Sequence, residues 1–268
     1  MSTSGGRAGP IRVAVDAMGG DFAPAEVVKG AVKAAQQLGV HVLLVGDQDV
    51  VSEELAKAGG PRPNVTVVPS QGKITEDEHP ALALRQKPRA SVVVATQLVK
   101  AAQADAVVSM GSTGATMASA ALVLGIFPGL ERPALGGPFL GLVPKVTMLD
   151  LGSNVDAKPA AMLSFAILGA SFSRIYLGIE RPRVALMSVG AEEAKGNRLV
   201  HETQPLLKRS GLNFVGNVEG FDLFTGKADV IVCDGFVGNV VMKFAEGMGA
   251  AIIHVLKQKL ARALPPAE

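Results

Sequence analysis

Cysteine, tryptophan and charged residues are all scarce in this 268-residue chain. The single cysteine, Cys233, excludes an intramolecular disulfide and a cysteine metal cluster. Tryptophan is absent and aromatic residues make up 4% of the chain, which argues against a surface that stacks nucleobases. The formal net charge of +2 is too small to indicate a nucleic-acid partner. The composition therefore excludes disulfide-stapled, zinc-cluster and nucleic-acid-binding proteins.

Long apolar runs are also missing, so we expect no integral membrane protein. The start of the chain, Met1–Pro10, is small and polar and lacks the apolar core of a signal peptide, which predicts a disordered tail over 1–10. The chain is 48% apolar and contains 31 glycines, which is ample for a large core. We therefore expect a single α/β domain over residues 11–268, in a cytoplasmic protein.

The stretch Ala106–Met117, AVVSMGSTGATM, has the pattern around which the rest of the chain is organised. Its apolar run predicts a buried strand, its glycines predict a turn, and helical character resumes directly afterwards. Such a turn leaves unpaired backbone N–H groups at a helix N-terminus, where the helix dipole favours negative charge. The pattern favours a cradle for phosphate or carboxylate. The alternative is a plain strand-to-helix turn in which Ser or Thr caps the helix.

Five predicted strands end in the same way, with an apolar run, then glycine beside polar residues, then a helix. The loops at these ends read MGGD, GSTG, GSNVDAK, GAEEAKGN and DGFVGN. Because parallel strands end at one edge of their sheet, we expect the loops to converge on one cleft. The predicted fold class is α/β, with a three-layer αβα arrangement and a mostly parallel sheet. We find no internal repeat in the sequence.

The loop residues are the candidate site residues, and they fall into two groups by expected role. The residues expected to bind a phosphate group are Asp16, Gly19, Gly20, Asp21, Gly111, Ser112, Thr113, Gly114, Asn154, Asp156, Gly235 and Asn239. The residues expected to act in catalysis are Lys195, Lys158, Asn197 and Asp234. Backbone N–H groups, amides, hydroxyls and lysines bind anions and stabilise an oxyanion. This set suits transfer to or from phosphate without a covalent enzyme intermediate.

Other chemistries have little support in the sequence. The four histidines have no metal-ligand spacing, and the chain has no serine-nucleophile elbow. Cys233 ends a predicted strand, where a buried packing role is favoured over a catalytic thiol. We expect neither a metal nor an organic cofactor, and no single residue stands out as a general acid or base.

Two segments group basic residues. Arg85, Lys87 and Arg89 lie either on a solvated helix and loop or on a surface that steers an acidic partner. The last helix, predicted to run toward Ala263, combines apolar residues at helical spacing with basic residues near its end. For its 244–253 segment, packing on the sheet or on a dimer partner is favoured, and lipid contact is the alternative for the distal half.

Seven motifs, in order along nearly the whole chain, carry a resemblance to a known family: VAVDAMGGDFAP (13–24), VSMGSTGATM (108–117), ERPAL (131–135), LDLGSNVDAKP (149–159), ALMSVGAEEAKGN (185–197), NFVGNVEGFDLF (213–224) and VCDGFVGNVVMK (232–243). The sequence resembles the PlsX family, the phosphate acyltransferases of bacterial phospholipid synthesis. The resemblance implies a fold like those of isopropylmalate dehydrogenase and phosphotransacetylase. It also implies formation of acyl phosphate from acyl-[acyl-carrier protein] and inorganic phosphate, without a cofactor.

The same resemblance implies partners and a location. These are acyl-carrier protein, a second copy of the chain in a homodimer, and the inner face of the cytoplasmic membrane, where a glycerol-3-phosphate acyltransferase uses the product. The chain departs from the family in two places: Ser112 stands where members usually have Asn, and the chain is expected to lack the family's C-terminal segment. The alternatives are a phosphotransacetylase-like enzyme that uses acyl-CoA, and an inactive module that binds carrier protein or membrane.

Overall fold

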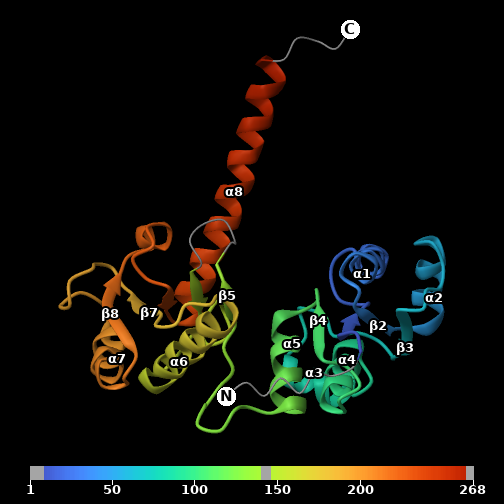
Figure 1. Cartoon of the computed structure of the whole chain (residues 1–268), viewed down its shortest axis with the longest axis horizontal. Coiled ribbons are helices and arrows are strands. Elements are labelled where there is room, and N and C mark those ends of the chain that lie inside the picture. Colours follow the sequence, from blue (N-terminus) through green and yellow to red (C-terminus); the bar gives the residue numbers. More distant parts are fainter. Residues whose placement is uncertain (1–8, 140–145, 264–268) are drawn as a thin grey trace. The chain divides into compact units, whose positions relative to one another are not determined.

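The computed structural model describes residues 9–139 and 146–263, so most of the tail predicted over 1–10 lies outside the described residues. The chain divides into two compact units, Met1–Phe127 (unit 1) and Pro128–Glu268 (unit 2), which are described here one at a time (Figure 1). Each unit has a sheet of its own. Whether the two units form the single α/β domain predicted over 11–268 depends on how they combine, so that domain stays a prediction.

Unit 1 is built on a parallel four-stranded sheet in the order β3-β2-β1-β4. Its strands are β1 (Arg12–Asp16), β2 (His41–Gly46), β3 (Val65–Pro69) and β4 (Ala106–Ser109). Its helices are α1 (Ala25–Leu38), α2 (Gln48–Lys57), α3 (Pro80–Gln86), α4 (Ser91–Lys100) and α5 (Thr113–Ser119), and α5 continues into a π-helical turn (Ala120–Leu124).

The strands of unit 1 are apolar on both faces, as expected of a parallel sheet covered on both sides. Val42 and Leu44 of β2 pack in the core beneath α1 and α2, whereas Leu43 and Val45 pack in the core that includes Ala95 of α4. The alternation follows from the two-residue period of a strand. Unit 1 is therefore a three-layer αβα sandwich, as predicted.

Unit 2 has a five-stranded sheet in the order β5-β6-β9-β7-β8, which is parallel except for β5. Its strands are β5 (Gly136–Pro138), β6 (Thr147–Leu149), β7 (Arg183–Met187), β8 (Asn213–Val218) and β9 (Val230–Val232). Its helices are α6 (Pro159–Tyr176), α7 (Arg198–Arg209) and α8 (Gly235–Ala263), with a 3-10 turn (Gly220–Phe224) after β8.

The sheet of unit 2 is also covered on both faces. Val184 and Leu186 of β7 pack in the core with residues of α6 and α7, including Phe165, which is fully buried. Ala185 and Met187 pack on the opposite face, where the first turns of α8 contribute apolar residues. The mostly parallel sheet and the αβα layering predicted from the sequence are thus confirmed in both units.

Helix α8 leaves its unit after the first turns, and Figure 1 shows it extending away from the rest of unit 2. Phe244 and Ile252, predicted to pack on the sheet or on a dimer partner, are 67% and 52% exposed. Packing on the sheet is therefore wrong for these two residues, because α8 continues past the edge of the sheet, whereas Ala245 packs on the core and contact with a dimer partner stays a prediction. The part Gly235–Lys259 is also long and apolar enough to cross a membrane by length and composition alone, which corrects the expectation that no segment is.

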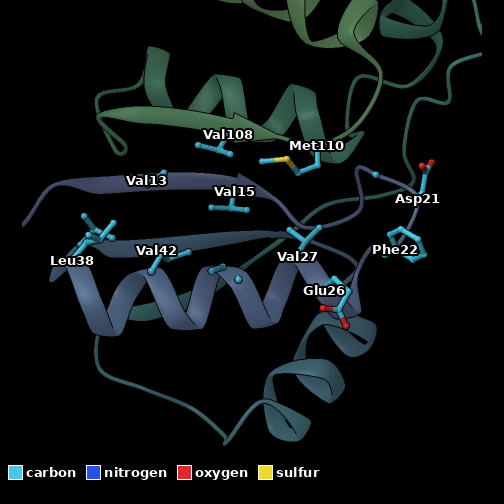
Figure 2. Close-up of a pocket in the computed structure, with 15 residues that line it drawn as sticks. Val13, Val15, Asp21, Phe22, Glu26, Val27, Leu38, Val42, Val108 and Met110 are labelled. Atoms are coloured by element: carbon cyan, nitrogen blue, oxygen red, sulfur yellow. The ribbon is translucent and has the colours of Figure 1, made fainter. Parts of the chain in front are cut away.

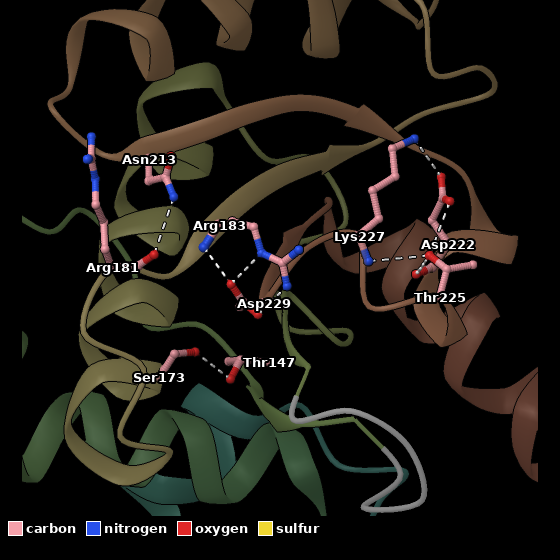
Figure 3. Close-up of polar contacts among 9 residues, drawn as sticks. All are labelled: Thr147, Ser173, Arg181, Arg183, Asn213, Asp222, Thr225, Lys227 and Asp229. Atoms are coloured by element: carbon pink, nitrogen blue, oxygen red, sulfur yellow. Dashed lines mark hydrogen bonds and ion pairs between the residues drawn. The ribbon is translucent and has the colours of Figure 1, made fainter.

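The two units share one short structural repeat, an Arg–Asp pair at the start of neighbouring parallel strands. In unit 2, Arg183 N–H donates to Asp229 Oδ2 at 2.8 Å and Asp229 N–H donates to the Arg183 carbonyl at 2.9 Å (Figure 3). In unit 1, Arg12 and Asp105 form the same two bonds, at 2.9 and 2.7 Å. This repeat is not visible in the sequence, because the paired residues are 46 positions apart in unit 2 and 93 positions apart in unit 1.

Candidate functional site

A buried carboxylate joins the ends of β1 and β4 in unit 1. Asp16, the last residue of β1, pairs in register with Ser109, the last residue of β4. The Ser109 hydroxyl donates to Asp16 Oδ2 at 2.7 Å, and the Met18 N–H donates to Asp16 Oδ1 at 3.2 Å. The Ser109 oxygen also accepts the Gly111 N–H at 3.1 Å. Asp16 therefore positions both glycine loops, and direct contact with a substrate stays a prediction.

The two glycine loops of unit 1 cross at a distance that admits no side chain. A Cβ on Gly19 would lie 2.6 Å from Asp16 Oδ2 and 2.8 Å from the Gly111 nitrogen. Gly20 has a φ of +109°, a conformation that other residues rarely adopt. The MGGD and GSTG loops, which are distant in sequence, thus meet at one sheet edge as predicted.

A small cavity of about 140 Å³ opens at this crossing. It is lined by four predicted site residues, Gly19, Gly20, Asp21 and Gly111. The loop after β3 adds Lys73, Thr75 and Glu76 to the lining. The lining thus combines glycine backbone and one lysine with two carboxylates, those of Asp21 and Glu76, and binding of a small anion there stays a prediction.

The helix start after Gly111 is the strand-to-helix turn with a serine cap that the sequence offered as the alternative to a phosphate cradle. The Ser112 hydroxyl accepts the Ala115 N–H at 3.3 Å, so it caps α5. Thr113 is exposed as the first residue of that helix. A Cβ on Gly114 would lie 2.8 Å from Pro80 Cγ, which gives this glycine a packing role. These three residues lie outside the lining of the cavity, and substrate binding by them stays a prediction.

A longer apolar groove of about 670 Å³ runs along α1 beside the same cavity. Figure 2 shows Val15, Val42 and Val108, from three neighbouring strands, above α1. Its lining includes Gly20 and Asp21, which also line the glycine cavity. Apolar surface therefore adjoins the polar cavity of unit 1.

In unit 2 the buried carboxylate of Asp150 holds the GSNVDAK loop. Asp150 is completely buried, and its carboxylate accepts from the N–H groups of Leu135, Ser153 and Asn154 at 3.0, 3.2 and 2.6 Å. It also accepts from the Ser153 hydroxyl at 2.7 Å and the Asn154 amide at 2.8 Å. The same amide reaches the Pro133 carbonyl at 2.9 Å. The Asn154 side chain, predicted to bind substrate, is thus engaged within its own loop.

The start of α8 packs tightly against that loop. A Cβ on Gly235 would lie 2.8 Å from the Asn154 nitrogen, and one on Gly238 would lie 1.8 Å from the Asp150 carbonyl oxygen. Asp234 Oδ1 accepts the Val237 N–H at 2.8 Å, so its carboxylate caps the helix. Asn239, also a predicted site residue, is exposed. The GSNVDAK and DGFVGN loops therefore converge at one edge of the sheet in unit 2.

The predicted catalytic residues of unit 2 differ in how far they are engaged. Asn197 Oδ1 accepts the Val200 N–H at 3.0 Å and so caps α7. Lys158 and Lys195 are both exposed, and neither ammonium has a hydrogen-bond or ion-pair partner within 9–139 and 146–263. Asp156, predicted to bind substrate, is exposed as well. The two lysines are thus available to an anion.

The loops at this edge of unit 2 also carry exposed apolar side chains. Each of the four parallel strands is followed by one such residue: Val155 after β6, Phe236 after β9, Val189 after β7 and Phe221 after β8, with 58%, 64%, 84% and 78% exposed. Neighbouring strands are about 4.8 Å apart, so the four loops span about 15 Å. This edge therefore offers apolar surface next to the two lysines.

Metal and thiol chemistry find no support in the part of the chain that the structure describes. No group of three or more His, Cys, Asp or Glu residues there is arranged to hold a metal ion. Cys233 is buried, and its burial, together with the charges of Asp234 and Asp150, raises the pKa of its thiol well above the usual value. The packing role predicted for this cysteine fits that environment.

One of the three predicted steering residues of unit 1 is already paired. The Lys87 ammonium lies 2.7 Å from Glu78 Oε1 and donates to the Lys73 carbonyl at 3.2 Å. The hydrogen bond from Lys87, followed by that from the Thr75 N–H, lowers the pKa of Glu78 to about 2. Lys87 therefore holds the loop that lines the glycine cavity, whereas Arg85 and Arg89 are exposed.

Sequence reasoning missed two residues in these clusters. Lys73 follows β3, and the rule that loops gather at the carboxyl edge of a parallel sheet would have included it. Asp150 directly precedes the GSNVDAK loop, and the sequence does not disclose its contact with Leu135, which is 15 positions away.

The fold resembles that of solved phosphotransacetylases. A phosphotransacetylase from Streptococcus pyogenes has a TM-score of 0.64 and 18% identity, over 90% of this chain and 82% of that one. The EutD phosphotransacetylase from Staphylococcus aureus has a TM-score of 0.60 and 18% identity, over 90% and 83%. At this identity the likeness shows the fold alone, and that fold is the one predicted.

Sequence comparison is more specific. The family described as "Fatty acid synthesis protein" matches residues 11–266. A phosphate acyltransferase from Desulforamulus reducens is 49% identical over 254 residues, which is 94% of this chain and 75% of the relative. A phosphate acyltransferase from Nostoc sp. is 48% identical over 260 residues, 95% of this chain and 75% of the relative.

The fold and the relatives together define an α/β acyltransferase. Glycine loops and lysines at the strand ends suit the chemistry of that enzyme class. The chain belongs to the fatty acid synthesis protein family, that is, to the PlsX family of phosphate acyltransferases.

Proposed function

We propose that the chain forms acyl phosphate from acyl-[acyl-carrier protein] and inorganic phosphate, as a step toward phosphatidic acid and membrane phospholipid. A phosphate oxygen attacks the thioester carbonyl, the new C–O bond forms and the C–S bond breaks. The carrier thiol leaves with the proton that hydrogen phosphate brings, so atoms and charge balance without a cofactor. Proximity and oxyanion stabilisation then supply most of the catalysis.

The observation that carries this proposal is that the strand ends present two kinds of group: a glycine-lined cavity in unit 1, and lysines without a partner among the described residues in unit 2. The 140 Å³ cavity of unit 1 has the size and donors for a small anion, which supports inorganic phosphate as the acceptor. In unit 2, Lys195 and Lys158 have no partner among the described residues, which supports a role in balancing the charge of phosphate or of the oxyanion.

The apolar surface beside both clusters supports a substrate with a long acyl chain. A groove of about 670 Å³ adjoins the cavity of unit 1, and four exposed apolar residues follow the parallel strands of unit 2. An acetyl group would need neither. This observation weighs against a short-chain acyl-CoA as the substrate but not against a long-chain acyl-CoA. Rates with acyl-carrier thioester and with acyl-CoA of the same chain length must therefore be compared directly.

Partner and location are parts of the same proposal. Arg85 and Arg89 are exposed and would steer the acidic carrier protein. The exposed apolar residues of α8, with Lys257 and Lys259 near its end, suit either a second copy of the chain or the inner face of the cytoplasmic membrane. We propose a homodimer that contacts this membrane peripherally, next to the glycerol-3-phosphate acyltransferase that takes the product.

Thr113→Val tests the phosphate cradle, because it removes a hydroxyl at the start of α5 while keeping the size of the side chain. We expect turnover at limiting phosphate to fall by roughly a hundredfold, the usual effect of losing one donor to developing charge. Gly114 is unsuitable for this test because a Cβ there would meet Pro80. Wild-type turnover in a folded Thr113→Val protein would remove the start of α5 from the site.

A charge reversal tests the carrier-protein surface. Arg85→Glu with Arg89→Glu should raise KM for acyl-carrier thioester and weaken its salt dependence, while KM for phosphate stays nearly unchanged. Arg174→Glu in unit 2 is the matched control, since Arg174 is exposed in the last turn of α6, as Arg85 is in the last turn of α3. If the double reversal and the control behave alike, the 85–89 segment is only a solvated face.

A further inference from the structure

Lys195 is held far more firmly than an exposed lysine needs to be. Its N–H donates to the Glu192 carbonyl at 3.0 Å, and its own carbonyl accepts the Asn217 amide at 3.0 Å. Its stem lies against Gly190, where an added Cβ would be 2.8 Å from Lys195 Cγ, 3.2 Å from Lys195 Cβ and 2.8 Å from Glu192 Oε2, the flexible end of a neighbouring side chain. The backbone and the first carbons of this lysine are therefore fixed, although its ammonium has no partner among the described residues.

Two buried amides supply the restraint. Asn217 of β8 is 3% exposed and Gln204 of α7 is 6% exposed. The Asn217 amide also donates to the Glu192 carbonyl at 3.1 Å, and its oxygen accepts from Gln204 Nε2 at 3.1 Å. Gln204 Nε2 donates further to the Glu193 carbonyl at 3.1 Å. The amide pair thus binds three carbonyl oxygens of one loop.

The two buried amides hold the loop without leaving a donor of either one unused. Burying an amide is unfavourable unless its polar atoms are hydrogen-bonded, and here the amide donors bind the backbone of a single short loop while Asn217 Oδ1 accepts from Gln204. Fixing the loop while leaving the lysine charge unpaired is how a preorganised cation is built, because no rearrangement is then needed when charge develops.

We propose that Asn217, supported by Gln204, is a positioning residue for Lys195, and that Gly190 is the platform on which the Lys195 stem rests. The proposal depends on the function proposed above, in which Lys195 faces phosphate or the developing oxyanion. Asn217 acts only through Lys195 and touches no reacting atom.

Asn217→Ala is the first test. We expect kcat to fall about tenfold to a hundredfold, as for a misplacement near 1 Å, while KM for the acyl-carrier thioester changes by less than about twofold. The control is Asn213→Ala, which removes the same side chain from the other end of β8, where it donates to the Arg181 carbonyl at 3.3 Å (Figure 3). The control should keep wild-type kcat.

Gly190→Ala tests the platform without touching the amides, and it serves if Asn217→Ala fails to fold. The added methyl displaces the Lys195 stem, so kcat should again fall about tenfold with KM for the thioester kept. Gly220→Ala is its control, because a Cβ there meets no atom within 4 Å. Equal kcat in the two glycine variants would overturn the platform.

A double-mutant cycle with Lys195→Met separates the two proposals. If Lys195→Met is impaired and Asn217→Ala or Gly190→Ala lowers kcat no further in that background, the residues act through Lys195. If Lys195→Met is impaired but the second change lowers kcat by its full separate factor, the positioning role is wrong and the catalytic lysine stands. If Lys195→Met keeps wild-type kcat, the role proposed for Lys195 fails, and the positioning role with it.

Discussion

Unit 1 and unit 2 place glycine-rich loops at the carboxyl ends of parallel strands, but they fix these loops by different means. In unit 1 a half-satisfied carboxylate, Asp16, holds two glycine loops that cross beside a small cavity. In unit 2 a fully buried carboxylate, Asp150, accepts five hydrogen bonds, four from its own loop and one from Leu135, and this loop and a neighbouring one present lysines. One strand-end pattern thus yields an open backbone cradle in one unit and a rigid, charge-bearing edge in the other.

The largest effect that sharpens this comparison is expected from Gly238→Ala in unit 2. A methyl there would lie 1.8 Å from the Asp150 carbonyl oxygen, so the loop and the start of α8 must separate. We expect the free energy of unfolding to fall by about 3 kcal/mol. Gly247→Ala, on the exposed part of the same helix with no atom within 4 Å, should instead raise it by up to ~1 kcal/mol. Denaturant melts of both variants check this, and equal losses would mean that helix propensity rather than loop packing is at work.

The next effect compares the shared Arg–Asp pair. The side chain of Asp229 is 16% exposed and that of Asp105 is 26% exposed, so the pair in unit 2 is better shielded on its acidic side. Burial opposes the ionisation of Asp229, but the hydrogen bonds and charge of Arg183 outweigh it and hold the pKa of Asp229 below its usual range. We expect Asp229→Asn to cost about 2 kcal/mol and Asp105→Asn about 1 kcal/mol, measured by thermal unfolding. The reverse order would show that shielding of the carboxylate does not set the strength of these pairs.

The smallest effect concerns acid and the loop over the cavity of unit 1. The pKa of Glu78 is lowered from 4.5 to about 2, so its clamp on Lys87 and Thr75 stabilises the folded state fully above the ordinary pKa and is lost as pH falls toward 2. The pair is partly exposed, which keeps its contribution small. Hydrogen exchange of the Thr75 amide should therefore accelerate at pH 3 relative to the intrinsic rate, and Glu78→Gln should show the faster exchange already at pH 6. An unchanged protection factor in both would contradict the clamp.

The sequence predicted those parts of the molecule that depend on local pattern. Strand ends, glycine loops and the long last helix all follow from periodicity and turn residues, and the MGGD and GSTG loops meet as expected because β1 and β4 are paired. The role of each polar side chain was less accessible. Ser112, Asn197 and Asp234 were predicted to bind or act on the substrate, yet each caps a helix. The nearest unpaired N–H groups are those in the first turn of the helix that follows each residue.

Long-range contacts account for most of what the sequence could not disclose. Asn217 reaches the 190–197 loop only because β8 lies beside β7, and nothing near it in sequence signals that partner. The exposure of Phe244 likewise depends on where the sheet of unit 2 ends, whereas its helical spacing would suit a buried face equally well.

The central claim is that lysine charge on the rigid edge of unit 2 serves acyl transfer to phosphate. The most direct measurement is the rate of acyl phosphate formation from a long-chain acyl-carrier thioester, with and without phosphate, for the wild-type chain, Lys158→Met, Lys195→Met and the control Lys57→Met. Lys57 is exposed on α2 and already pairs with Glu53 and Glu54. The account predicts that product forms only with phosphate, that at least one of the first two variants loses about a hundredfold in rate, and that the control loses none. Wild-type rates in both Lys158→Met and Lys195→Met would contradict it.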